Sequence, residues 1–219
     1  AHGDNGAAFE ALRAAEEQAQ EQGVTPPTAF RIDALRVHLL LAQANLEAVS
    51  RWAHEQALDP GDEISYKYQI AYLTMSRILI AQNRVNTALD LLGRLLAQAE
   101  TLGQMGRALE VLILQSLALA SSGDTSGALT VLGRALAHGQ SEGYVRSFLD
   151  EGASMAKLLR QAGSRGIVPK YVAGLLSQFD SEIGITPARQ QPLIEPLTER
   201  ELEVLHLMAD GFSNQESAG

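Results

Sequence analysis

The sequence predicts an all-α fold, and three observations indicate that class. Hydrophobic residues make up 46% of the 219 residues but aromatic residues only 5%. Alanine, leucine, valine and isoleucine must therefore fill the core, and the first two are strong helix formers. No proline lies between Pro60 and Pro169, and Gly103, Gly123 and Gly143 divide this stretch as glycines that end helices do. Apolar residues recur there at helical spacing, and no segment alternates with a period of two, so strands are not expected.

The same patterns predict the individual helices in order. Prolines and glycines interrupt the helical apolar spacing at intervals, and each uninterrupted segment between them is long enough for one helix. The predicted helices cover residues 7–21, 27–43, 45–58, 62–82, 85–101, 104–122, 125–140, 144–162 and 168–180.

A pair of helices is repeated along the chain. Residues 88–103 and 128–143 share eight identities in sixteen positions at a constant offset of 40, and residues 39–53 form a weaker copy. Each unit is expected to hold a first helix (A), a tight turn and a second helix (B) that opens on a small alanine. The expected turns are Ala44-Asn45, Asn83-Arg84 and Gly123-Asp124. A single hairpin cannot bury both apolar faces, so we expect the units to stack into a right-handed superhelix whose A helices line the concave surface.

The C-terminal part has a different composition. Residues 181–196 carry three prolines and few large apolar side chains, which is typical of an extended linker. Thr198 with Glu201 forms a capping box before an apolar helix that Gly211 ends, and Ser213 with Glu216 forms a second one. A helix, a glycine turn and a second helix form the beginning of a helix-turn-helix unit.

Residues 197–216 (LTERELEVLHLMADGFSNQE) closely resemble the opening of the LuxR-type DNA-binding domain of bacterial transcription regulators. Residues 143–179 resemble the end of the helical-repeat domain in the large MalT-like branch of that family. This resemblance implies a tetratricopeptide-like repeat domain at 1–180, a linker at 181–196 and an incomplete helix-turn-helix at 197–219. The positions that carry the DNA-binding motif are Thr198, Arg200, Glu201, Val204, Leu205, Gly211, Ser213, Asn214 and Glu216.

The match to the DNA-binding domain stops before the helix that reads DNA bases. Ser217 stands where the family has an isoleucine, and the printed chain stops at Gly219 without a recognition helix. From Thr198 onward, Arg200 is the single base against five acids, whereas phosphate contacts require Lys or Arg. We expect a fragment that does not bind DNA by itself, whose parent protein does. ATP is implied only for an absent upstream module, since no phosphate-binding GxxxxGK[ST] motif is present.

The resemblance implies a sensor, so the concave surface is the candidate binding site. Tyrosine offers a rigid ring with a hydroxyl, and arginine a planar set of donors, for a small effector or a peptide. The alternative is that the tyrosines pack between helices with their hydroxyls at the rim. The alternative function is a scaffold that docks a partner protein or peptide and senses no small molecule. The candidate groove residues are Arg36, Tyr66, Tyr72, Arg77, Arg107 and Gln115.

Other chemistry finds little support in the sequence. The absence of cysteine excludes disulfides, thiolate catalysis and Cys-ligated metals. The five histidines are scattered, so no metal site is expected, and no triad or carboxylate pair indicates an enzyme. Asp150 and Glu151 are interpreted as caps of the helix that contains Met155. A net charge of −9 argues against anionic membranes and broad nucleic-acid binding. We expect a cytoplasmic protein that is capable of self-association.

Overall fold

The computed structural model describes residues 4–22 and 25–183, and the helical prediction is confirmed there: the described residues contain helices and no strand. The chain divides into two compact units, Ala1–Asp180 and Ser181–Gly219. The predicted DNA-binding motif and all but the first residues of the predicted linker lie outside the described residues. The helices are α1 (Asp4–Gln22), α2 (Pro26–Ala42), α3 (Leu46–Glu55), the 3₁₀ turn η1 (Tyr66–Tyr68), α4 (Gln69–Ala81), α5 (Val85–Thr101), α6 (Met105–Ser121), α7 (Thr125–Glu142), α8 (Arg146–Leu149), α9 (Gly152–Ser164) and α10 (Pro169–Ile183).

The turns between helices repeat the same backbone geometry. Ala44, Asn83, Gly103 and Gly123 all have positive φ, and the amide of each following residue donates to a carbonyl five residues earlier. For Arg84 that bond reaches Leu79 O at 2.8 Å. This pattern ends one helix and starts the next within a few residues. The three turns predicted from the sequence therefore lie where the repeat placed them.

The core fills the space between the paired helices. Its largest fully buried side chains are Phe148 of α8 and a set of leucines and isoleucines on α4 to α7. Equivalent positions of the repeat share the same burial: Leu92 and Leu132 are both 0% exposed. Ala88 and Ala128 near the starts of α5 and α7 are also fully buried, as expected for small residues that let two helices approach closely. A second, smaller cluster is formed by Val37, Val49, Trp52 and Ile78.

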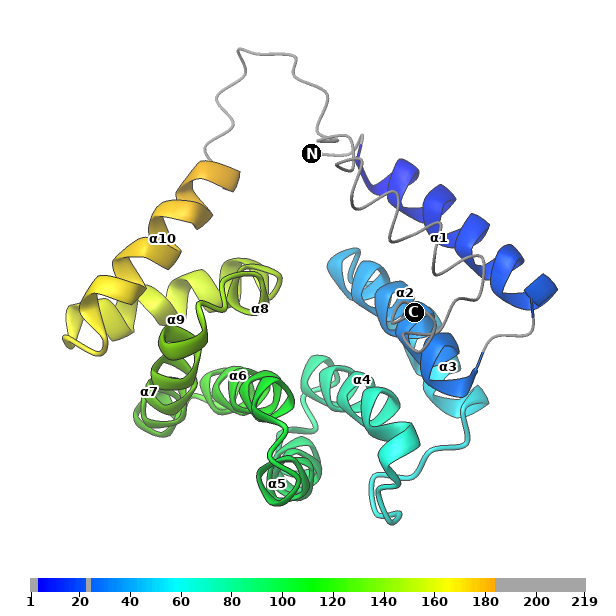
Figure 1. Ribbon diagram of the computed structural model, residues 1–219, viewed down its shortest axis with the longest axis horizontal. Helices are drawn as coiled ribbons and strands as arrows, with labels where there is room; N and C mark the ends of the chain where they lie inside the picture. The colour runs from blue at the N-terminus through cyan, green and yellow to red at the C-terminus, as the bar shows by residue number, and fades with distance from the viewer. Residues whose placement is uncertain (1–3, 23–24, 184–219) are drawn as a thin grey trace, which may run out of the picture. The chain divides into compact units, whose positions relative to one another are not determined.

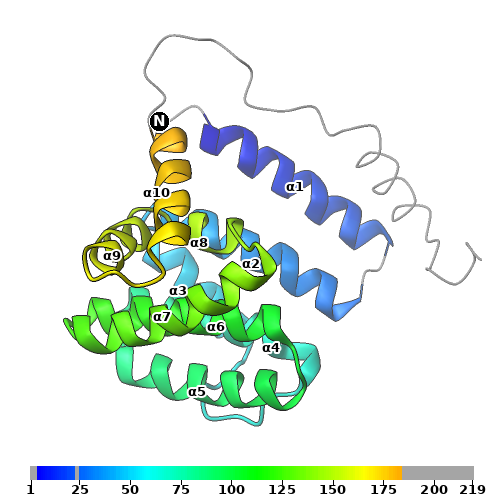
Figure 2. The same cartoon turned by 60° about the vertical axis from the view of Figure 1, so that its left-hand side comes forward.

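The first helices of successive units, α2, α4 and α6 (the A helices), pack against one another and form one side of the stack. α4 contacts both α2 and α6, while α5 and α7 both pack against α6. Figure 1 shows α2, α4 and α6 side by side on the inner side, with α5 and α7 on the outer side. Figure 2 shows α5, α6 and α7 running alongside one another. This all-α stack of helical repeats confirms the predicted fold class.

Several predicted helix boundaries were wrong, and the helix predicted at 45–58 ends at Glu55. The helix predicted at 62–82 is regular only from Gln69, because side chains of α5 bind the carbonyls that an earlier start would need. Arg94 donates to the carbonyls of Pro60 and Asp62, and Gln98 donates to the carbonyl of Ile64 at 2.9 Å. The last helix extends to Ile183, three residues into the predicted linker.

The helix predicted at 144–162 is broken into α8 and α9. Gly152 adopts a left-handed conformation, with φ of +65°, which interrupts the helical path. The sequence suggested that Asp150 and Glu151 cap the helix that contains Met155. In the structure the Glu151 side chain makes no capping hydrogen bond to α9, and Asp150 pairs with Arg146 at 2.8 Å. The break creates a short loop, residues 150–152, whose contacts are described below.

Candidate ligand-binding groove

Three adjoining pockets run along the surface of the A helices. Their volumes are about 350, 380 and 690 Å³. The first two share Arg31, Ile70 and Arg107, and the second and third share His38 and Arg77, so they form a continuous surface, here called the A-helix groove. Its lining comes from the A helices and from the segments beside them. These residues are, on α2, Thr28, Arg31, Ala34, Leu35, His38 and Leu41; on η1 and α4, Tyr66, Lys67, Gln69, Ile70, Leu73, Thr74, Arg77, Ile80 and Ala81; on α6 and its N-cap, Gln104, Arg107, Glu110 and Leu114; at the α2–α3 turn and the start of α3, Ala44 and Leu46; and at the α8–α9 connection and the start of α9, Asp150, Glu151, Gly152, Ala153 and Ser154.

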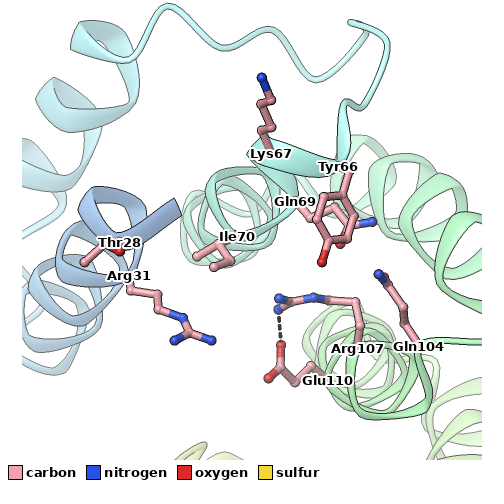
Figure 3. Close-up of a pocket in the computed structure, with 9 residues that line it drawn as sticks. All are labelled: Thr28, Arg31, Tyr66, Lys67, Gln69, Ile70, Gln104, Arg107 and Glu110. Atoms are coloured by element: carbon pink, nitrogen blue, oxygen red, sulfur yellow. Dashed lines mark hydrogen bonds and ion pairs between the residues drawn. The ribbon is translucent and has the colours of Figure 1, made fainter. Parts of the chain in front are cut away.

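The first pocket, here called the Arg31–Arg107 pocket, is the more polar end of the groove. Figure 3 shows the Arg31 and Arg107 side chains extending toward one another from α2 and α6, with the Tyr66 hydroxyl pointing toward Arg107. Arg107 Nη1 donates to Glu110 Oε2 at 2.6 Å, one helical turn along α6. That single bond leaves the other donors of the guanidinium available.

A partly buried chain of hydrogen bonds holds the floor of this pocket in place. Gln69 is 3% exposed, and its amide donates to Gln98 Oε1 at 2.7 Å. Gln98 in turn donates to the carbonyl of Ile64 at 2.9 Å. Because both amides are engaged, the backbone that carries Tyr66 and Lys67 is tied to α5 and the pocket wall is preorganised.

In the middle of the groove, two A helices contact the α8–α9 connection through residues that are distant in sequence. Arg77 Nη2 of α4 donates to Glu151 Oε1 at 2.6 Å, and both side chains are largely buried, at 23% and 11% exposure. His38 Nε2 of α2 lies 3.1 Å from the carbonyl oxygen of Asp150. The loop at 150–152 is therefore fastened to two A helices, and we call these two contacts the loop latch.

The structure brings three of the six predicted groove residues to this surface: Tyr66, Arg77 and Arg107. Tyr72 instead faces the core at 3% exposure, which matches the alternative that a tyrosine packs between helices. Burial raises the pKa of the Tyr72 phenol. Arg36 reaches α1, where Arg36 Nε donates to Glu16 Oε1 at 2.7 Å.

Helix geometry explains why Gln115 does not share the groove face. Arg107, Glu110 and Leu114 are spaced by three and four residues, so they lie on one face of α6. Gln115 follows Leu114 by one position and is turned about 100° from it. Ile70 and Arg77 of α4 line one pocket for the same reason, because their spacing corresponds to about two helical turns and places them on one face.

Sequence reasoning missed several lining residues. Arg31, Ile70 and Glu110 lie within predicted helices but are not among the six candidate groove residues. The available signal was the spacing of three and four residues on either side of Arg77 and Arg107. Glu151 carried no such signal, because its contact with Arg77 joins residues 74 apart in the sequence.

The described residues give no support for metal or membrane chemistry. They contain no group of three or more His, Asp or Glu side chains that could hold a metal ion. None of the helices within residues 4–22 and 25–183 is long and apolar enough to cross a bilayer. The groove is a surface of mixed polar and apolar side chains from α2, α4, α6 and the α8–α9 connection.

Comparisons with known proteins identify similar sequences. A family model described as the MalT-like TPR region matches residues 1–165. The protein described as HTH-type transcriptional regulator MalT, from Vibrio campbellii (strain ATCC BAA-1116), is 26% identical over 198 residues. That alignment covers 81% of this chain and 22% of the regulator, so the chain spans about a fifth of that protein's length.

Proposed function

This chain belongs to the family of MalT-like TPR regions, and on that premise we propose that it is the effector-sensing region of a LuxR-type transcriptional regulator. The A-helix groove is the proposed site where the effector binds. The observation that carries this proposal is the continuity of the groove over α2, α4 and α6. A ligand in it touches several repeats at once.

The loop latch supplies a mechanism for such a sensor. Arg77 and His38 both line the groove and both hold the loop at 150–152. A ligand that takes Arg77 as its partner competes with Glu151, and the α8–α9 connection is then free to move. Ligand binding would favour one arrangement of the repeats over another, and self-association of the regulator would follow that arrangement.

The complete regulator, rather than this chain, is proposed to bind DNA. The net charge of −9 and the five acids after Thr198 oppose phosphate binding. ATP is proposed only for an upstream module of the parent protein. A transcriptional regulator acts where DNA is, so the proposal places it in the bacterial cytoplasm. A mobility-shift assay at low salt is expected to show no retardation by this chain, and sequence-specific retardation would contradict this part of the proposal.

Ligand screening tests the sensing proposal directly. A thermal-shift screen of sugars, nucleotides and aromatic metabolites is expected to include compounds that raise the melting temperature of this chain. Ile70→Trp places a large ring at the junction of two pockets and should abolish that stabilisation. Thr130→Trp on the exposed surface of α7 is the matched control and should retain it. Failure of every compound, together with a partner protein captured by the unmodified chain but not by Ile70→Trp, would favour the scaffold function instead.

A further inference from the structure

We propose that the Arg31–Arg107 pocket binds the anionic group, a carboxylate or a phosphate, of a small-molecule effector. This inference rests on the proposed sensing function and names the ligand chemistry of one part of the groove. It depends on four observations: the unpaired charge of Arg31, the remaining donors of Arg107, an unpartnered acceptor at the wall and the size of the pocket.

Arg31 differs from most arginines of this chain because it forms no ion pair with any described residue. The chain carries 26 acidic residues against 17 basic ones, so carboxylates are abundant. Arginines that pair with a carboxylate within the described ranges are Arg13, Arg36, Arg51, Arg77, Arg107, Arg134, Arg146 and Arg160. An arginine that lines a pocket without such a partner is available to an anionic ligand.

Arg107 completes the anion site from the opposite wall. Its bond to Glu110 fixes the guanidinium of a side chain that is 23% exposed, while Nη2 and Nε make no hydrogen bond to the described residues. Figure 3 shows the guanidinium groups of Arg31 and Arg107 facing the same space, whereas Lys67 extends away from it. Two guanidinium groups on either side of one space suit a carboxylate or a phosphate, because the oxygens of these anions accept paired hydrogen bonds from a guanidinium.

Gln104 indicates a further feature of the ligand. Its equivalents in the neighbouring turns, Asn45 and Asp124, cap their helices with their side chains, but Gln104 does not cap α6. Gln104 Oε1 is enclosed and has no hydrogen-bond partner among the described residues. A buried acceptor without a partner is unfavourable, so a ligand hydroxyl or ammonium next to the anionic group would satisfy it once the amide turns inward.

The size of the pocket limits the ligand to a small molecule. A volume of about 350 Å³ lies at the lower end of the range for small-molecule sites. Glu110 lies beside Arg107, so a ligand with many negative charges would meet repulsion. The chemistry therefore fits a hydroxy acid, an amino acid or a sugar phosphate with one anionic group at the arginines.

Calorimetric titration of the complete chain tests this assignment. The probes are L-malate, inorganic phosphate and glucose 6-phosphate, with glucose as the neutral partner of the last and sodium chloride at matched ionic strength. At least one anion should bind and raise the melting temperature, and glucose should not. Preference for malate or for the phosphates identifies the anionic group. Arg31→Gln and Arg107→Gln should each weaken that binding by about tenfold or more, as expected for a charged hydrogen-bond partner.

The matched control is Arg134→Gln, which removes the same charge from α7, where Arg134 pairs with Glu100 outside the groove. It should leave the affinity unchanged. Binding of no probe beyond the chloride control, or equal losses in Arg31→Gln and Arg134→Gln, would overturn the anion assignment. If a neutral compound from the screen still binds and Ile70→Trp abolishes it, the sensing groove stands and this inference alone fails.

Discussion

The ion pair between Arg77 and Glu151 should contribute more to stability than any surface pair of this chain. Its N–O distance is 2.6 Å, and its side chains are 23% and 11% exposed. Exposed pairs contribute roughly 0.2–1 kcal/mol, whereas loss of one member of a fully buried pair costs about 3–5 kcal/mol. The intermediate burial here places the cost of Glu151→Gln at about 2 kcal/mol, because Arg77 then keeps a charge with no counter-charge.

A double-mutant cycle isolates this contribution. Urea unfolding of the unmodified chain, Arg77→Met, Glu151→Gln and the double variant, followed by far-UV circular dichroism, gives the four free energies of unfolding. The interaction energy should be about 1–2 kcal/mol. A cost of 2 kcal/mol in a chain of this size corresponds to a fall of about 4–8 °C in melting temperature.

The control cycle uses Arg134 and Glu100, which also join two helices. Their N–O distance is 3.0 Å, and both side chains are 51% exposed. This pair should give an interaction energy of about 0.5 kcal/mol or less. The reasoning is refuted if the two cycles give the same energy, since burial would then have no effect on the strength of the pair.

Three further predictions concern packing, capping and pH. Gly139→Ala should destabilise the chain by about 1–3 kcal/mol in urea unfolding, because a Cβ there would lie 2.8 Å from Phe148 and from Tyr171 Oη. Gly93→Ala, where the Cβ meets no atom within 4 Å, should instead stabilise it by up to about 1 kcal/mol, and equal effects would contradict the packing argument. Asp124→Ala should cost about 1 kcal/mol in thermal unfolding, since Asp124 Oδ1 accepts from Gly127 N at 2.9 Å; a loss of no more than a few tenths would be evidence against the cap. Burial raises the pKa of Tyr72 above its ordinary value of 10.0, so the unfolded chain loses this proton first and stability falls as the pH rises through 10. Tyr72→Phe should reduce that alkaline loss in unfolding curves measured from pH 8 to pH 11, and an unchanged slope would refute the assignment.

Part of the groove could be predicted from the sequence, because its walls follow a helical period. The A helices and their order came from the repeat, and Arg77 and Arg107 were selected on them. Tyr72 was also selected, but periodicity does not say which face of a helix turns toward the core when apolar residues surround it. In α4 both faces are rich in apolar residues, and packing against α5 buries Tyr72.

The loop latch could not be predicted for a different reason. Arg77 and Glu151 lie 74 residues apart, and His38 and the carbonyl of Asp150 lie 112 apart. No local pattern links residues at such distances. The interpretation of Glu151 as a helix cap was a local reading, and a distant arginine proved to be its partner instead.

The sequence by itself determined the all-α class, the repeat unit and its turns, because helix formation and turn geometry depend on residues within about five positions of one another. Only the tertiary structure decided which side chains share the groove, where the helix at 144–162 breaks and that, among the described residues, Arg31 is the groove arginine without a carboxylate partner. Those outcomes depend on how the helices pack and on which charges meet between them, and such contacts join residues that are far apart in the sequence.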